Sequence, residues 1–193
     1  MDNDNTRHLP GNWGQPSQCG WRTSRAVPAM TDFRTVSLVA ATVSMGLAAG
    51  TFDLYAHTIM PGLTKTDDQT FVGAFQSIDR AIINPWFIGT TFLGALSLTA
   101  AAGIANWKQP TFGWIVVAFA AYVVVVAITI SVNVPLNNAL KAAGNPATID
   151  VTAARATFRE ARWVGWNLVR AVASTAGFVS LAWALVIQGR SAP

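Results

Sequence analysis

Apolar residues fall in four long runs separated by shorter polar stretches, at residues 36–56, 86–105, 112–132 and 164–187. Each run is close to the ~20 residues that an α-helix needs to cross a hydrocarbon layer ~30 Å thick. Because the bilayer offers backbone N–H and C=O groups no partner, each run should be helical along its buried length. The pattern predicts an all-α integral membrane protein, a four-helix bundle within residues 34–190.

The segment between the first two runs has amphipathic character. After a polar turn, four large apolar residues recur at helical spacing within residues 69–83, and Asp68 is placed to cap the start of such a helix. The four residues are Phe71, Phe75, Ile78 and Ile82. This spacing predicts an amphipathic interfacial helix that lies along the membrane surface between spans one and two.

Proline marks the expected end of two spans. Pro61 follows the first run by five residues and Pro135 follows the third by three, so each helix should stop at its proline. Asp150 is placed to cap a further helix, which should run through Arg155, Arg159 and Arg162 into the fourth span.

Residues 1–33 are rich in Asn, Gly, Pro and Ser and have little apolar periodicity, which is typical of a disordered N-terminal tail. They lack the apolar core of a signal peptide. Met30, just ahead of the first span, is an alternative first residue of the protein. In that case the residues before it are an extension added when the gene start was assigned.

The composition agrees with this assignment as a membrane protein. Hydrophobic residues make up 52% of the 193 residues and charged residues 11%, which is too apolar for an ordinary soluble domain. The net charge of +4 is scattered, so no nucleic-acid partner is expected, and the partner is the lipid bilayer.

Arg34, beside the first span, favours cytoplasmic termini in a bacterial cytoplasmic membrane. The oligomeric state is left open, and the single Cys19 excludes an internal disulfide.

Two helical faces carry polar residues. Gly46, Gly50, Asp53 and His57 follow one another at steps of four, three and four residues, and therefore share one face of the first span. The fourth span has a comparable face, made of Trp163, Asn167, Arg170, Ser174 and Gly177. Glycines on the first face predict close approach of another helix.

Antiparallel spans bring most of the polar side chains to one end of the bundle. Ionisable groups inside the bilayer cost several kcal/mol each and usually face a cavity or a partner. The converging residues are Asp53, Tyr55, His57, Asn84, Asn133, Asn137, Asn167 and Arg170. The asymmetry predicts a functional site at that end.

Several of these residues have a structural reading beside the functional one. Arg170 can form an ion pair with Asp53 or polarise a ligand, and both roles are compatible. His57 can be an exposed surface residue or a catalytic base. Asn133 and Asn137 can cap broken helix ends or face the site.

Tyr55 lies off the Asp53 face, which favours an interfacial anchor. Asp53 and His57 have the i, i+4 spacing of two metal ligands, but two ligands at one spacing are a weak signal. No metal site is therefore predicted.

Five stretches of the chain carry a resemblance to a known family. They are Met60-Pro-Gly-Leu63, Asp67-Asp-Gln-Thr-Phe-Val-Gly-Ala-Phe-Gln-Ser-Ile-Asp-Arg80, Asn84-Pro-Trp-Phe87, Asn133-Val-Pro-Leu-Asn-Asn138 and Trp163-Val-Gly-Trp-Asn-Leu-Val-Arg170. In this order, and over roughly residues 33–186, the chain resembles the anthrone oxygenase-like family of small four-span membrane proteins.

The resemblance implies oxidation of a small aromatic or polyketide substrate by dioxygen, with no organic cofactor required. It implies roles for the residues at the converging ends. His57, oriented by Asp53, would be the base, and Arg170 with Asn167 would stabilise the anion formed from the substrate. The substrate-binding residues would be Tyr55, Phe87, Asn133, Asn137, Trp163 and Trp166. The alternative is a non-enzymatic small membrane protein that is transport-associated, lipid-binding or a structural partner.

Overall fold

The structure is a computed structural model that describes residues 29–190, and most of the predicted tail, including Cys19, lies outside this range. All elements of the described part are helices, with three π-helical segments (η) among the α-helices. In chain order the elements are α1 (Ala29–Leu54), η1 (Tyr55–Ile59), α2 (Met60–Leu63), α3 (Asp68–Ile82), η2 (Phe87–Phe92), α4 (Leu93–Ala105), α5 (Phe112–Ile128), η3 (Thr129–Asn133), α6 (Val134–Ala142), α7 (Val151–Phe158) and α8 (Glu160–Arg190).

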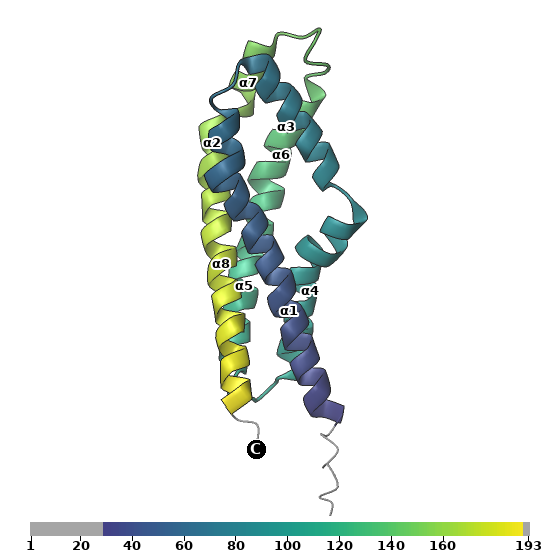
Figure 1. Ribbon diagram of the computed structural model, residues 1–193, viewed down its shortest axis with the longest axis vertical. Coiled ribbons are helices and arrows are strands. Elements are labelled where there is room, and N and C mark those ends of the chain that lie inside the picture. Colours follow the sequence, from purple (N-terminus) through teal and green to yellow (C-terminus); the bar gives the residue numbers. More distant parts are fainter. Residues whose placement is uncertain (1–28, 191–193) are drawn as a thin grey trace, which may run out of the picture.

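Four continuous helical stretches are long and apolar enough to cross a membrane, which confirms the predicted all-α membrane bundle. They are Phe33–Leu63, Phe87–Ala105, Phe112–Ala142 and Glu160–Arg190. Figure 1 shows the described N-terminal end and the end of α8 on the same side of the bundle. The first, third and fourth stretches each have 31 residues, whereas the second has 19.

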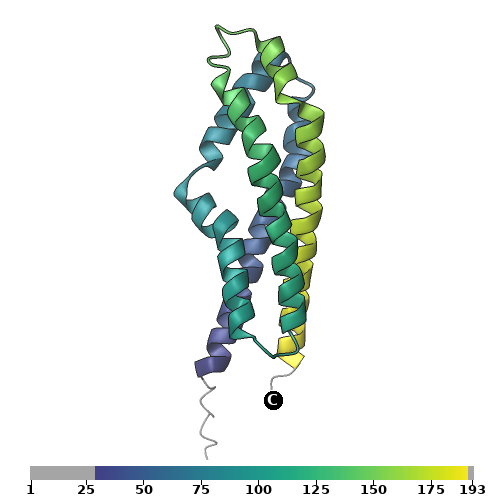
Figure 2. The ribbon, with the colours of Figure 1, turned by 180° about the vertical axis from the view of Figure 1, so that it is seen from behind.

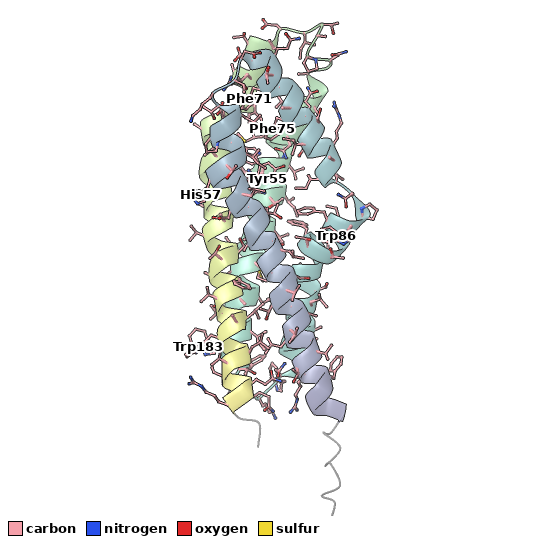
Figure 3. The ribbon with its side chains drawn as sticks, in the orientation of Figure 1. Tyr55, His57, Phe71, Phe75, Trp86 and Trp183 are labelled. Atoms are coloured by element: carbon pink, nitrogen blue, oxygen red, sulfur yellow. The ribbon has the colours of Figure 1, made fainter. Side chains whose placement is uncertain are left out.

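The shortest stretch marks where the membrane lies. Trp86 and Trp107 flank it, with 63% and 60% of their surface exposed, and tryptophan prefers the membrane interface. At 1.5 Å per residue the helix between them is about 30 Å long, the thickness of the hydrocarbon layer. The three longer stretches are flush with it at the end that holds the termini, so they project about 18 Å beyond Trp86 at the other end (Figure 3). We call the projecting part, formed by α2, α3, α6 and α7, the head.

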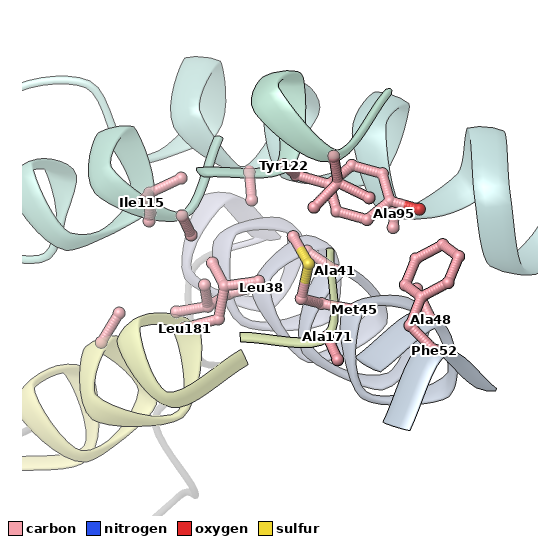
Figure 4. Packing of buried hydrophobic residues seen from close by; sticks show 14 residues of the cluster. Leu38, Ala41, Met45, Ala48, Phe52, Ala95, Ile115, Tyr122, Ala171 and Leu181 are labelled. Carbon is pink, nitrogen blue, oxygen red and sulfur yellow. The ribbon is translucent and has the colours of Figure 1, made fainter. Parts of the chain in front are cut away.

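The four spans pack around a core of small and medium apolar side chains (Figure 4). Leu38 and Met45 of α1, Tyr122 of α5 and Leu181 of α8 are fully buried in it. Gly177 of α8 lies close against this core, where an added Cβ would be 3.3 Å from the Met45 sulfur. Such contacts hold helices together in lipid, where burial of apolar surface gives no driving force.

The expected glycine face of α1 behaves differently at its two glycines. A Cβ added at Gly46 would lie 3.0 Å from the Phe178 ring, as close approach of a helix requires. Gly50 has no heavy atom within 4 Å of that position, so this half of the face is open.

The amphipathic helix after the first span is confirmed as α3, with Phe71 and Phe75 buried. Its N-cap is Asp67, whose side chain accepts from the Thr70 N–H, and not Asp68 as expected. The apolar face packs on the protein itself, against α6 and α7. Figures 1 and 2 show α3 descending steeply from the tip of the head to the turn at Trp86, so it does not lie across the membrane surface as predicted.

The predicted helix after Asp150 is also confirmed as α7, and the Asp150 carboxylate caps it by accepting from the Ala153 N–H. The helix α7 does not run into the fourth span. Arg159 adopts a left-handed conformation with φ of 54°, which separates α7 from α8. A non-glycine residue at positive φ ends a helix, since it turns the chain out of the helical path.

Neither Pro61 nor Pro135 stops its helix. Each lies in the first turn of a short α-helix that directly follows a π-helical segment, η1 or η3. Proline has no N–H to donate, and the wider π turn accommodates the backbone groups left without their ordinary partner. The remaining π segment, η2, begins two residues after Pro85. Three of the four spans therefore contain a π segment close in sequence to a proline.

Candidate functional site

Arg170 lies on the inner face of α8, within the span, and is 5% exposed. The helical spacing of Trp163, Asn167, Arg170 and Ser174 predicted a single face, and all four are buried. A guanidinium cannot lose its charge at neutral pH, so the bundle holds a buried cation close to the level at which the head begins. A charge in this position needs hydrogen-bonding partners or a ligand.

The partners of Arg170 are neutral. One terminal nitrogen donates to the Asn167 side-chain oxygen at 2.8 Å and the other to the Thr129 hydroxyl at 3.2 Å. The guanidinium carbon lies 4.6 Å from the centre of the Phe52 ring and 5.5 Å from that of Trp163. The Nε atom is buried and has no hydrogen-bond partner. With Asn133, these five residues form what we call the Arg170 cluster.

The expected Asp53–Arg170 ion pair is not formed. Over the described residues, no carboxylate lies within salt-bridge distance of Arg170. Asp53 pairs instead with His57, one turn along its own helix, with 3.2 Å between Oδ1 and Nε2. Both side chains are more than half exposed, at 57% and 68%. The predicted meeting of this face with that of α8 does not occur, since Asp53 and His57 lie on the outer side of the first span.

Asn133, at the end of η3, joins the cluster and is fully buried. Its amide nitrogen donates to the Trp163 carbonyl at 3.3 Å. Because a carbonyl can only accept, the amide nitrogen must face it, and the side-chain oxygen then points the other way. That oxygen has no partner. The cluster thus contains one buried donor and one buried acceptor that the protein leaves unsatisfied.

A chain of hydrogen bonds connects the cluster to the head. The Trp163 indole N–H donates to the Asn137 side-chain oxygen, and the Asn137 amide donates to Asp79 Oδ1, both at 2.6 Å. The other Asp79 oxygen lies 2.6 Å from Lys141 Nζ. Asp79 is 6% exposed. The chain fixes the Trp163 ring, which forms one wall of the Arg170 cluster.

Tyr55 points into the bundle and is 9% exposed, so it is not the interfacial anchor that its position off the Asp53 face favoured. Its ring lies 5.7 Å from that of Trp163, centre to centre. The phenol is within electrostatic range of both Asp79 and Arg170. It borders the cluster from the side of the head.

The remaining predicted residues are placed less favourably. Phe87 opens η2 and is partly buried, while Trp166 is 40% exposed on the outer face of α8. Asn84 is exposed and caps the turn before η2, where its side-chain oxygen accepts from the Phe87 N–H. Asn84 therefore acts at the start of a helix.

Two surface hollows lie away from the cluster. One, of about 380 Å³, is lined by α5 and α8 side chains that include Trp114, Phe178 and Trp183, toward the end that holds the termini. The other, of about 430 Å³, lies between α6 and α7 in the head. The side chains of the Arg170 cluster pack against one another, so a ligand must displace some of them, and the ring of Tyr55 borders the cluster on the side of Trp163.

Three residues of the site were not predicted: Phe52, Thr129 and Asp79. Phe52 has no polar atom to attract notice, although it lies three residues before Tyr55 on the inner face. Thr129 is four residues before Asn133, which is a detectable spacing. Asp79 is the one carboxylate buried in the described chain, and its signal was its position on the apolar side of an amphipathic helix.

No group of three or more His, Cys, Asp or Glu side chains able to hold a metal occurs within residues 29–190. A comparison with family models matches residues 84–180, about half of the chain, to the family described as anthrone oxygenase. The matched range contains η2, η3 and the Arg170 cluster except for Phe52, which lies on the first span. No curated protein and no solved structure matches the chain.

Proposed function

We propose, for a chain that belongs to the anthrone oxygenase family, that it oxidises a small aromatic or polyketide ketone with dioxygen at the Arg170 cluster. The observation that supports this proposal is the buried guanidinium without a carboxylate partner. A fixed cation in a site of low dielectric stabilises an anion formed there far more than it would in water.

The chemistry needs an anion-stabilising site more than it needs a cofactor. The methylene group of an anthrone is acidic because its anion is delocalised onto the ring oxygen. Arg170, with Asn167 holding one of its nitrogens, would stabilise that oxygen, and the rings of Tyr55 and Trp163 would contact the flat ligand. Stabilisation of this anion lowers the barrier to removal of the methylene proton, the step that forms the species able to react with dioxygen.

Asp79 is the proton acceptor in this proposal. It is buried, and two hydrogen bonds connect it through Asn137 to the Trp163 indole. A ligand seated against Trp163 would lie beside the Arg170 guanidinium and next to the hydrogen-bonded chain that runs from the Trp163 indole through Asn137 to Asp79. His57 and Asp53, on the outer side of the helix, are not needed.

The proposed reaction balances without a further reductant. The methylene proton passes to Asp79, and the anion adds dioxygen to give a carbon-bound peroxide anion. Asp79 returns the proton to that peroxide. Loss of water breaks the O–O bond and removes the second methylene hydrogen, which leaves the new carbonyl. One dioxygen is consumed per anthrone, and one quinone and one water are formed.

The test is oxygen uptake by the purified full-length protein with anthrone, corrected for the spontaneous oxidation measured without protein. We expect one dioxygen consumed per anthraquinone formed. Arg170→Gln should lower the rate roughly 10²-fold, as loss of an oxyanion-stabilising donor does. Arg162→Gln, an exposed arginine two turns earlier on α8, is the matched control and should leave the rate unchanged.

Equal rates with and without the wild-type protein would reject the proposal and favour the non-enzymatic alternative, a transport-associated, lipid-binding or structural membrane protein. If Arg170→Gln oxidises anthrone at the wild-type rate, the reaction does not take place at the Arg170 cluster.

We also propose that both ends of the chain face the cytoplasm, which places the head beyond the outer face of a bacterial cytoplasmic membrane. Arg34 supports this, since it lies at the start of the first span and donates to the Ala105 carbonyl. After Cys19→Ser, a cysteine at exposed Ser77 of the head should react with an impermeant maleimide in right-side-out vesicles. Reaction only in inverted vesicles would reverse the orientation.

A further inference from the structure

The hollow between α5 and α8 is lined by apolar and aromatic side chains and has a volume of about 380 Å³. Figure 3 shows Trp183, one of its walls, on the outer side of α8 near the end that holds the termini. Within a bilayer such a hollow is filled by an acyl chain or by another apolar protein surface. The lining residues are Trp114 of α5 with Phe178, Val179, Ala182, Trp183 and Val186 of α8.

The hollow extends over about one leaflet of the bilayer. Phe178, a lining residue, precedes Arg190 at the end of α8 by 12 residues, which is about 18 Å along the helix. One leaflet contributes half of the ~30 Å hydrocarbon layer. The hollow therefore begins near the middle of the membrane and ends at the last turn of α8, at the level where lipid headgroups lie.

A cation lies at the headgroup end of the hollow. The guanidinium carbon of Arg190 is 5.9 Å from the centre of the Trp183 ring. No carboxylate of the described residues lies within salt-bridge distance of this guanidinium. The hollow thus combines an apolar channel along one leaflet with a positive charge at its mouth.

We propose that this hollow binds one anionic phospholipid, with an acyl chain between α5 and α8 and the phosphate accepting hydrogen bonds from the Arg190 guanidinium. The chain by itself gives no selectivity, because bulk lipid surrounds it with equally apolar groups. The charge does, since a basic residue at the membrane surface attracts anionic headgroups. Arginine also presents paired N–H donors that match the oxygens of a phosphate.

A second copy of the chain fits the hollow less well. A two-fold symmetric contact uses the same surface on both subunits. It would bring two Arg190 guanidinium groups to one interface, and no described carboxylate lies close enough to compensate either of them. The lipid site lies apart from the Arg170 cluster and does not depend on the proposed oxidation.

The test is native mass spectrometry of the detergent-purified full-length protein. The protein is mixed with equal amounts of phosphatidylglycerol and phosphatidylcholine that carry the same acyl chains. We expect the first lipid retained to be phosphatidylglycerol roughly five times more often than phosphatidylcholine, the factor that one basic residue near a membrane surface contributes.

Two variants address the two parts of the site. Arg190→Gln should retain both lipids equally. Its matched control is Lys108→Gln, which removes a cation from the turn between α4 and α5 and should keep the preference. Ala182→Phe fills the hollow and should lower the number of retained lipids by one per chain. Val172→Phe adds the same ring at an exposed position of α8 outside the hollow and should retain lipid as the wild type does.

Equal retention of the two lipids by the wild type would overturn the inference. A preference that Arg190→Gln keeps, or that Lys108→Gln loses to the same degree, would also overturn it, because the attraction would then not come from Arg190 alone. Unchanged lipid retention in Ala182→Phe would remove the hollow from the site. A wild-type dimer that Ala182→Phe converts to a monomer would overturn the inference too, and would assign the hollow to a second copy of the chain.

Discussion

The guanidinium of Arg170 lies over the ring of Phe52, with the guanidinium carbon 4.6 Å from the ring centre. The two residues come from the first and fourth spans and meet inside the bundle, where an aromatic face partly replaces the missing carboxylate. A cation–π contact contributes about 2 kcal/mol when it is desolvated, less than the cost of burying the charge. The arginine is therefore retained at a cost to stability.

Replacement of this arginine by an apolar residue should separate stability from activity. In Arg170→Met we expect an unfolding temperature equal to or above that of the wild type, because a buried charge without a charged partner is removed. The oxidation rate should fall roughly 10²-fold. Thermal unfolding in detergent, followed by tryptophan fluorescence, measures the first quantity. A marked loss of stability would show instead that the guanidinium is structural, and Arg162→Met serves as the control.

The Trp163 indole N–H should contribute to stability through its single hydrogen bond to Asn137. Trp163→Phe keeps an aromatic ring but leaves the Asn137 oxygen without this donor, which should cost about 1–2 kcal/mol. Denaturant unfolding of the two proteins gives the difference. Trp166→Phe, at the 40% exposed tryptophan three residues later, should change stability by less than about 0.5 kcal/mol. Equal effects of the two substitutions would contradict the role assigned to the N–H.

The head should lose stability in acid. Asp68 accepts hydrogen bonds from the Thr152 hydroxyl and from Arg155, and these lower its pKa below the ordinary value. Since the folded-state pKa lies below the unfolded one, this stabilisation is present above about pH 4 and is lost as the pH falls through the folded-state pKa. Asp68→Asn should be less stable than the wild type at pH 7 and equal to it in strong acid. A difference that persists unchanged in acid would contradict this origin.

The number, nature and approximate place of the spans follow from the sequence, because the bilayer allows an apolar run of ~20 residues only one backbone structure. The buried face of the fourth span was also predictable, since Trp163, Asn167, Arg170 and Ser174 keep helical spacing. The lengths of the helical stretches could not be predicted from the sequence. The spans continue into the head beyond their apolar runs, where contacts with α3 and α7 replace lipid and leave no hydropathy signal.

The rotation of the first span could not be predicted from its polar residues. Asp53 and His57 share a face with Gly46 and Gly50, which favoured an inward orientation, but the bundle buries the face of Met45, Phe52 and Tyr55 instead. The prolines misled for a related reason. A proline ends a regular α-helix, yet a preceding π turn absorbs its missing donor, and π turns depend on tertiary packing that one sequence does not reveal.

The position of His57 leads to a prediction opposite to the role first expected of it. Its imidazole pairs with Asp53 on the outer side of the first span and is 68% exposed, whereas the Arg170 cluster is inside. Oxygen uptake by His57→Ala and by Asp53→Asn should therefore stay within about twofold of the wild-type rate, as for ordinary surface substitutions. Asp79→Asn should lower it at least 10²-fold, the usual contribution of a general base. Asp68→Asn, at the paired carboxylate near the start of the same helix, is the matched control. If a well-folded His57→Ala protein loses turnover while Asp79→Asn stays active, the prediction is wrong, and His57 rather than Asp79 is the proton acceptor.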